Sequence, residues 1–156
     1  MARSGKVDIK GLENFKKNLE KNLDEDQIHM FIESCAKELA ARLLAKVIKR
    51  TPVGEYPAET GKKGGTLRRG WTNGKSSGAS AYVDGLKVNY FGGNYVIEII
   101  NPVEYASYVE FGHRTRGGKG WVEGKFMLTI SEQEIQRDSS KILENKLKKK
   151  LGECFK

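Results

Sequence analysis

The amino-acid sequence predicts an α+β fold: a small antiparallel sheet packs against a long amphipathic helix, with an additional C-terminal helix and a long mobile loop. Apolar residues recur at helical spacing between positions 28 and 47, and two runs rich in β-branched residues flank a glycine-containing turn near position 92. Between them, residues 52–80 are rich in glycine and basic residues but poor in aliphatic side chains. At 156 residues, the chain is expected to form a single domain, residues 1–156.

The N-terminal segment, residues 1–23, is expected to form a strand followed by a helix. Apolar and polar residues alternate from Val7 to Lys10, which predicts a short strand, and Gly11 ends it. Apolar side chains then recur at helical spacing at Leu12, Phe15, Leu19 and Leu23. Residues 12–23 are therefore predicted to form an amphipathic helix.

The long helix is predicted over about residues 26–50 and should form the spine of the fold. Asp24 followed by Gln27 fits a capping box at its start. Its apolar face contains Ile28, Phe31, Ile32, Cys35, Leu39, Leu43 and Val47. Thr51-Pro52 ends the helix, because the residue before a proline avoids the helical conformation.

Residues 52–80 are expected to form a long basic loop, in which only Thr66–Trp71 makes an ordered turn. A loop of this length is usually either functional or disordered. Strands are predicted at Ala81–Tyr90 and Tyr95–Ile100, and the second of them is rich in β-branched residues. The turn signal at Phe91–Asn94 joins them into a hairpin.

A short helix is predicted at Val103–Phe111. Asn101 suits the N-cap, Pro102 suits the first helical position, and Glu104 completes a capping box. The residues expected to share one face and anchor this helix in the core are Tyr105, Tyr108 and Val109. Gly112 is expected just past the end of the helix, where the left-handed conformation favours glycine.

The C-terminal helix is predicted over residues 131–152, with Ser131 and Glu134 as its capping box. The segment before it, Trp121–Ile130, is expected to be a strand or extended chain. The helix has a narrow apolar stripe among many lysines. Such a stripe packs either on its own domain or on a neighbouring subunit, and the sequence leaves both interpretations open.

The formal net charge of +8 favours acidic partners, such as nucleic acid, an anionic membrane surface or an acidic protein face. The most apolar stretch, residues 36–48, contains four charged residues, so no membrane-spanning segment is predicted. The two cysteines, Cys35 and Cys154, show no pattern of a disulfide scaffold, although the sequence leaves a disulfide between them open. This cysteine usage predicts a reducing, intracellular setting.

No catalytic, cofactor-binding or metal-binding residue is predicted. His113 lies in a basic loop, but neither Glu110 nor Glu123 lies at a spacing diagnostic of a catalytic pair. The two cysteines and two histidines do not form a zinc-ligand spacing. A phosphate-binding loop is excluded because Gly61-Lys62 is followed by lysine rather than serine or threonine. The residues thus show no pattern of a catalytic centre, and a small enzyme that uses His113 is the least favoured interpretation.

Two loops concentrate positive charge, and the sequence leaves two interpretations of them open. Trp71 and Trp121 flank these loops and could stack on bases, but arginine and tryptophan also dominate protein interfaces. The basic residues that would face DNA are Lys62, Lys63, Arg68, Arg69, Arg114 and Arg116. Although no known nucleic-acid-binding motif occurs, a basic nucleic-acid-binding module that uses residues 60–75 and 113–120 is the alternative function.

Two stretches carry recognisable patterns. The first, Thr51-Pro52-Val53, then Thr60-Gly61, then Thr66-Leu67-Arg68-Arg69-Gly70-Trp71, is similar to T-P-x-x-T-G-x-L-R-x-S. The second, Tyr105 to His113, is similar to Y-A-x-Y-V-E-x-G-T. Together they resemble a family of small neck, head-tail joining and tail-completion proteins of tailed phages and prophages, also labelled minor tail components. Gly70 stands where serine is common in that family, and His113 replaces threonine.

The resemblance implies a structural protein, not an enzyme, without cofactors at the head-tail junction: a neck, head-tail connector, tail-completion or tail-terminator component. It implies a homo-oligomeric ring, typically a hexamer around the DNA channel, docked on head-closure or connector proteins and on tail-tube or tail-terminator proteins. Assembly would occur in the host cytoplasm, after which the chain is part of the virion or of a prophage-derived tail particle. Non-specific DNA contact is a secondary expectation. The residues expected at subunit or partner interfaces are Leu67, Arg68, Arg69, Trp71, His113, Arg114, Arg116, Trp121, Leu143 and Leu147.

Overall fold

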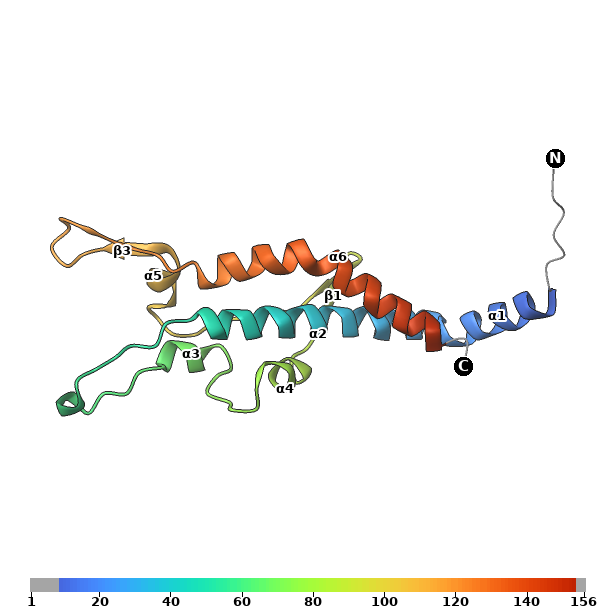
Figure 1. Ribbon diagram of the computed structural model, residues 1–156, viewed down its shortest axis with the longest axis horizontal. Helices are drawn as coiled ribbons and strands as arrows, with labels where there is room; N and C mark the ends of the chain where they lie inside the picture. The colour runs from blue at the N-terminus through green and yellow to red at the C-terminus, as the bar shows by residue number, and fades with distance from the viewer. Residues whose placement is uncertain (1–8, 154–156) are drawn as a thin grey trace.

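The computed structural model describes residues 9–153 and shows an elongated molecule built along one long helix (Figure 1). That helix, α2 (Glu25–Arg50), lies at the centre, and α6 (Met127–Glu153) packs alongside it in the opposite direction. The N-terminal helix, α1 (Ile9–Asn22), continues beyond the start of α2. The predicted α+β class, with one long central helix and small antiparallel sheets, is confirmed.

The strand predicted at the N-terminus is replaced by a helix. Val7 and Asp8 lie outside the described residues, but Ile9 and Lys10 belong to the first turn of α1. Gly11 therefore lies inside a helix rather than at its boundary. A single glycine within a helix costs only about 1 kcal/mol, which the helical pattern of the following residues outweighs.

The predicted start and end of the long helix are confirmed. The Asp24 side chain caps α2 by accepting a hydrogen bond from the Gln27 backbone N–H at 2.8 Å, and Thr51 is its extended C-cap residue. The predicted apolar face is displaced, because the buried residues of α2 are Ala40, Leu44 and Val47. The apolar face around Ile28 and Ile32 is exposed, since α3, α4 and α6 supply core side chains only to the C-terminal half of α2.

The segment predicted as one long loop is partly helical. It contains a short turn of 3₁₀ helix (Ala58–Thr60), α3 (Thr66–Gly70) and the start of α4 (Ala79–Asp84). The first predicted strand is thus wrong over α4, where Val83 is fully buried and Tyr82 packs against the same core cluster. Contact with α2 stabilises the helix there, and such packing outweighs local strand propensity.

The predicted hairpin is confirmed but short. It consists of β1 (Asn89–Phe91) and β2 (Asn94–Val96), with Tyr90 opposite Tyr95. The hairpin is held on the N-terminal half of α2 by a hydrogen bond between His29 Nδ1 and the Tyr95 hydroxyl. The His29 and Tyr90 rings also meet edge to face, with centroids 5.5 Å apart.

The second small sheet lies between two helices. It is formed by β3 (Gly112–Arg114) and β4 (Trp121–Glu123), which follow α5 (Ala106–Phe111) and precede α6. The helix α5 begins later than predicted, and Asn101 instead accepts a hydrogen bond from the Val103 N–H two residues on. The helix α6 begins earlier than predicted, so Ser131 and Glu134 lie inside it and not at its cap.

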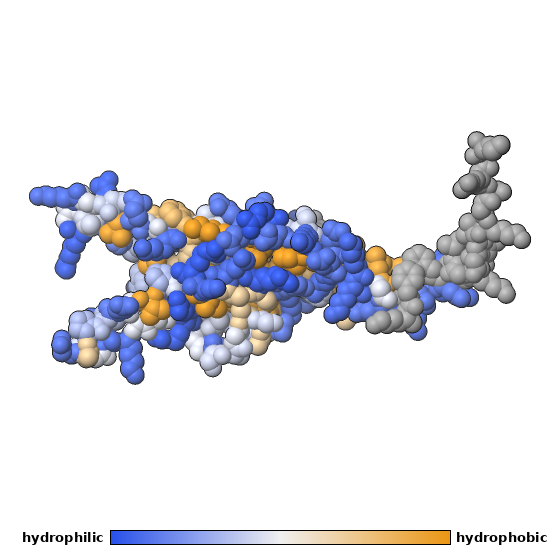
Figure 2. All heavy atoms as spheres, viewed as in Figure 1, coloured by the Kyte–Doolittle hydropathy of each residue, from blue (hydrophilic) through white to orange (hydrophobic). Residues whose placement is uncertain are grey.

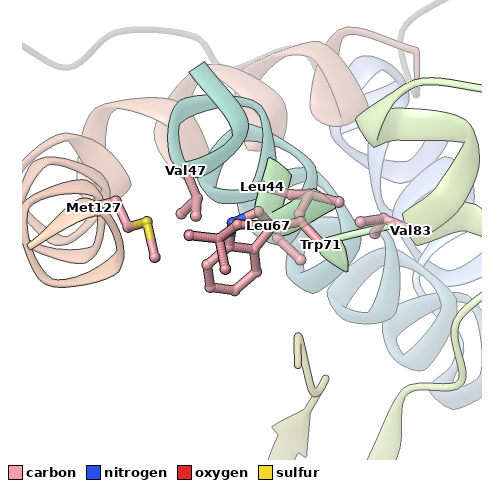
Figure 3. Packing of buried hydrophobic residues seen from close by; sticks show 7 residues of the cluster. Leu44, Val47, Leu67, Trp71, Val83 and Met127 are labelled. Carbon is pink, nitrogen blue, oxygen red and sulfur yellow. The ribbon is translucent and has the colours of Figure 1, made fainter. Parts of the chain in front are cut away.

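The hydrophobic core gathers side chains from α2, α3, α4 and α6 (Figure 3). The labelled residues that converge there are Leu44, Val47, Leu67, Trp71, Val83 and Met127. Burial of each such side chain stabilises the fold by about 1.5–3 kcal/mol. Within residues 9–153, no helix is both long and apolar enough to cross a membrane.

Candidate functional site

Two arms project from the same end of the molecule (Figure 1). Arm A, residues 52–65, leaves the C-terminus of α2 and returns to α3. Arm B, residues 112–124, is the β3–β4 hairpin and leads from α5 to the N-terminus of α6. Because α2 and α6 run in opposite directions, the roots of both arms lie at the same end of the helix pair.

The root of arm A is held by Thr51, which is fully buried at the end of α2. Its hydroxyl donates to the Val47 carbonyl at 2.7 Å and accepts from the indole nitrogen of Trp71 at 2.8 Å. The guanidinium of Arg68 donates twice to the Thr51 carbonyl, at 3.1 and 2.7 Å. The first sequence pattern is therefore an internal clamp that joins α2 to α3.

This clamp changes the interpretation of several predicted interface residues. Leu67 and Trp71 are 5% and 4% exposed and belong to the core, so little of either side chain is accessible at the surface. Arg68 is half-buried against Thr51. Arg69 is exposed, and its guanidinium donates to the Gly64 carbonyl at 3.2 Å. Tryptophan and leucine at helical spacing cannot be assigned to core or interface from sequence alone.

The root of arm B is held by Glu110, which is only 5% exposed. Its carboxylate accepts hydrogen bonds from the backbone N–H groups of Leu128 and Thr129, each at 2.9 Å, and from the Thr129 hydroxyl at 2.7 Å. An acidic group suits this position because the first N–H groups of a helix lack partners within the helix. Glu110, rather than the predicted Ser131, thus caps the C-terminal helix.

Ion pairs join α2 to α6 behind the two roots. Glu134 bonds to Lys46 at 2.7 Å and also to Arg50, while Arg50 donates to the Ser131 hydroxyl at 3.0 Å. The hydrogen bond from Lys46, followed by that from Arg50, lowers the pKa of the Glu134 carboxyl from 4.5 to about 2. A second pair, Lys146 with Glu38 at 2.9 Å, lies farther along the helices. The arms therefore project from a helix pair, α2 and α6, whose two members are joined by ion pairs at several points.

Close backbone contacts shape both arms. A Cβ atom on Gly64 would lie 1.9 Å from the Gly54 carbonyl oxygen, so the two sides of arm A can approach only at glycine. In arm B, a Cβ atom on Gly124 would lie 2.3 Å from the Glu110 carbonyl oxygen. Gly112 has a φ of 85°, as the predicted glycine past the end of α5 requires.

The two arms differ in charge. Arm A carries Lys62 and Lys63, which are exposed, but Glu55 and Glu59 balance them. Arm B has a net positive charge, because its exposed basic residues outnumber Glu123. Those basic residues are Arg114, Arg116 and Lys119. Of the two arms, only arm B therefore carries a net positive charge, although Arg69 and Lys75, which follow arm A in the chain, are also exposed.

Exposed aromatic side chains lie in and beside the roots of the arms, and Figure 2 shows separate hydrophobic spots beside each arm. We call this set the root patch; it consists of Tyr56, Tyr105, Tyr108, Phe111, Trp121 and Phe126. Tyr105 and Tyr108 were predicted to anchor α5 in the core, but they are 45% and 59% exposed. Of the predicted anchors, only Val109 packs against the core cluster, since α5 touches the core with one narrow side.

The remaining predicted interface residues, His113 and two leucines of α6, lie in different parts of the molecule. His113 is half-buried beside Tyr108, with ring centroids 5.8 Å apart, and its Nδ1 has no hydrogen-bond partner among residues 9–153. On α6, Leu143 is half-buried and Leu147 is exposed, so the apolar stripe is only partly covered by the chain itself. In the described part of the chain, no group of three or more histidine, cysteine or acidic residues is placed to hold a metal ion.

Comparison with known protein families finds a match over more than half of the chain. The model described as "HK97-gp10_like: Bacteriophage HK97-gp10, putative tail-component" matches residues 13–112. The matched region includes the Thr51 clamp and Glu110, and it ends where arm B begins. No curated protein matches the chain, and no solved structure does.

Proposed function

Because this chain belongs to the HK97-gp10-like family of bacteriophage tail components, we propose that it is a structural protein of the head-tail junction that assembles as a ring, typically a hexamer. In this role it completes the neck or tail and docks on the connector and tail-tube proteins of the particle. The chain acts through surfaces rather than through a reaction. It assembles in the host cytoplasm and then remains in the virion or prophage-derived particle.

The observation that carries this proposal is the root patch, a set of exposed aromatic side chains in and beside two arms whose roots are held by buried hydrogen bonds. Aromatic residues are enriched at protein interaction sites, and six of them are exposed in the root patch. The Thr51 and Glu110 clamps fix the direction of both arms before binding, which reduces the entropy lost on association. The end of the molecule that carries the arms thus has a fixed shape, exposed aromatic side chains and some positive charge. These properties suit a protein that docks on other proteins.

A ring requires two different complementary surfaces on each subunit, because each copy contacts the next by rotation. The arms and root patch lie at one end, whereas the exposed apolar residues of α2 and α6 lie along the body. These two surfaces are distinct, as a ring contact demands. Interface candidates that remain accessible are Arg69, His113, Arg114, Arg116, Trp121 and Leu147.

Native mass spectrometry and negative-stain microscopy of the purified chain test this proposal. The measurements are made at high protein concentration, alone and mixed with the connector and tail-tube proteins of the same particle. Closed oligomers of one size are expected in at least one of these samples. A chain that stays monomeric in all of them, and binds neither partner, is incompatible with the proposed role.

Nucleic-acid binding is the second candidate, and one observation favours it: Arg114, Arg116 and Lys119 are exposed together on arm B. This candidate predicts salt-sensitive binding to DNA that weakens when Arg114 and Arg116 are replaced by alanine. The half-buried position of Arg68, which bonds to the Thr51 carbonyl, and the neutral charge of arm A weigh against it. Rings that form without such DNA affinity would exclude DNA binding as the main role.

A further inference from the structure

The chain beyond β2 has the pattern of a strand without a neighbour. Ile97 and Ile99 are half-buried and pack against the core cluster, whereas Glu98 and Ile100 are exposed. This alternation is typical of a β-strand with one covered face. Nevertheless, no backbone hydrogen bond joins residues 97–100 to any other part of residues 9–153. An unpaired strand edge of this kind readily accepts another strand.

An apolar groove of about 510 Å³ lies beside this segment, between it and the two long helices. Its apolar lining includes Leu39, Leu43, Ile97, Ile99, Leu128 and Ile135. The only charged residue that lines it is Glu132. Glu132 and Glu98 are both exposed, and neither has an ion-pair partner in the described part of the chain. We call the free strand and this groove the acceptor edge.

Arm B has the complementary properties. It is a two-stranded ribbon with free outer edges, and Trp121 and Val122 on β4 are 54% and 44% exposed. Arg114 and Arg116 are exposed and have no ion-pair partner within residues 9–153. The ribbon thus offers unpaired backbone groups, apolar side chains and positive charge, where the acceptor edge offers unpaired backbone groups, an apolar groove and negative charge.

We propose that the acceptor edge binds arm B of a second copy of this chain, so that the ribbon extends the β1–β2 sheet of its neighbour. The same chain cannot fill its own edge in this conformation, since arm B projects away from the body (Figure 1). The contact joins two different surfaces, and its repetition produces a closed ring when the rotation between copies closes. This inference rests on the proposed ring assembly and assigns its contact surfaces.

Charge reversal tests the contact without altering the core. The acceptor variant carries Glu98→Lys with Glu132→Lys, and the arm variant carries Arg114→Glu with Arg116→Glu. A control variant, Lys17→Glu with Lys21→Glu, makes the same change in net charge as the arm variant at exposed positions of α1. Each is measured by native mass spectrometry at low salt, in the sample in which the wild-type chain forms rings.

We expect each reversed variant alone to associate about tenfold or more weakly, because like charges then face each other across the contact. An equimolar mixture of the two variants should form rings again, with the variants alternating, because both contacts in the mixture pair opposite charges. The control variant should assemble like the wild-type chain.

Two outcomes overturn the inference while the proposed function stands: reversed variants that assemble normally, or a mixture that fails to restore rings although the wild-type chain forms them. A wild-type chain that forms no oligomer under any condition overturns both proposals. The substituted side chains are exposed, and circular dichroism with a thermal melt verifies that every variant is folded. Restored assembly in the mixture is a result that loss of folding cannot produce.

Discussion

The carboxylate of Glu110 accepts hydrogen bonds from both the backbone N–H and the hydroxyl of Thr129, at 2.9 and 2.7 Å. The two residues lie 19 positions apart in the chain, on either side of arm B. One buried acidic side chain therefore caps α6 and closes the root of the hairpin at the same time.

Replacing Glu110 by glutamine should destabilise the protein by about 1–3 kcal/mol, since the amide group offers fewer acceptors to the start of α6. Urea unfolding followed by circular dichroism measures the change in the free energy of unfolding. Glu104→Gln is the matched control, because Glu104 is exposed and makes no hydrogen bond among residues 9–153. Equal effects of the two substitutions would contradict the assignment of Glu110 as the cap.

The hydrogen bond between Trp71 and Thr51 is expected to contribute to stability through its burial. Thr51→Val removes the acceptor and leaves the Trp71 indole N–H unsatisfied in the core, which should cost about 1–3 kcal/mol. Trp71→Phe removes the donor instead. A double-mutant cycle should give a coupling free energy of at least about 0.5 kcal/mol. Strictly additive effects would show that the bond is not formed in solution.

Gly70 is expected to tolerate a larger side chain poorly, because the neighbouring Asn101 side chain leaves no room for one. A Cβ atom there would lie 2.3 Å from the side-chain oxygen of Asn101, whose amide also donates to the Leu67 carbonyl. We expect Gly70→Ala to cost about 1–3 kcal/mol. Gly152→Ala, with open space around it in the last turn of α6, should be neutral or stabilise by up to about 1 kcal/mol. Thermal unfolding of both variants distinguishes packing from a general effect of replacing glycine.

Acid should weaken the link between α2 and α6 at Glu134. Its carboxyl has a pKa of about 2 in the folded chain against an ordinary value of 4.5, because Lys46 and Arg50 donate hydrogen bonds to it. A lowered folded-state pKa means that the stabilisation is complete above the unfolded value and is lost as the pH falls toward the folded value. We therefore expect the urea midpoint to fall between about pH 4.5 and pH 2, with a shallower fall in Glu134→Gln. If the urea midpoints of the wild-type chain and of Glu134→Gln fell in parallel over this pH range, the assignment of the acid effect to Glu134 would be wrong.

The two tryptophans should behave in opposite ways. Trp121 is 54% exposed, so Trp121→Ser should change the free energy of unfolding by no more than about 0.5 kcal/mol while it weakens self-association. Trp71 is 4% exposed, so Trp71→Ala should cost about 3–5 kcal/mol and reduce assembly only through unfolding. Analytical ultracentrifugation together with urea unfolding separates the two effects. A loss of stability in Trp121→Ser would place that side chain in the core.

Several features follow from residues that lie close together in the chain. Asp24 and Gln27 define the start of α2, Thr51-Pro52 defines its end, and Gly112 terminates α5 with a positive φ of 85°. Each signal acts within about four residues, because capping bonds, steric restriction before proline and the freedom of glycine are local effects. Hence the long helix, the hairpin turn and the two motif-bearing segments could be predicted from sequence.

The sequence by itself thus determined where α2 begins and ends, where the chain turns, and which stretches carry the family patterns. Only the tertiary structure decided that Trp71 is buried whereas Trp121 is exposed, that α4 is a helix, and that Glu110 caps a helix that begins beyond arm B. The physical reason is the range of the interactions. Burial and long-range hydrogen bonds depend on which elements pack together. The elements that pack on α2 contact one face of it, and the spacing of its apolar residues does not define which face that is.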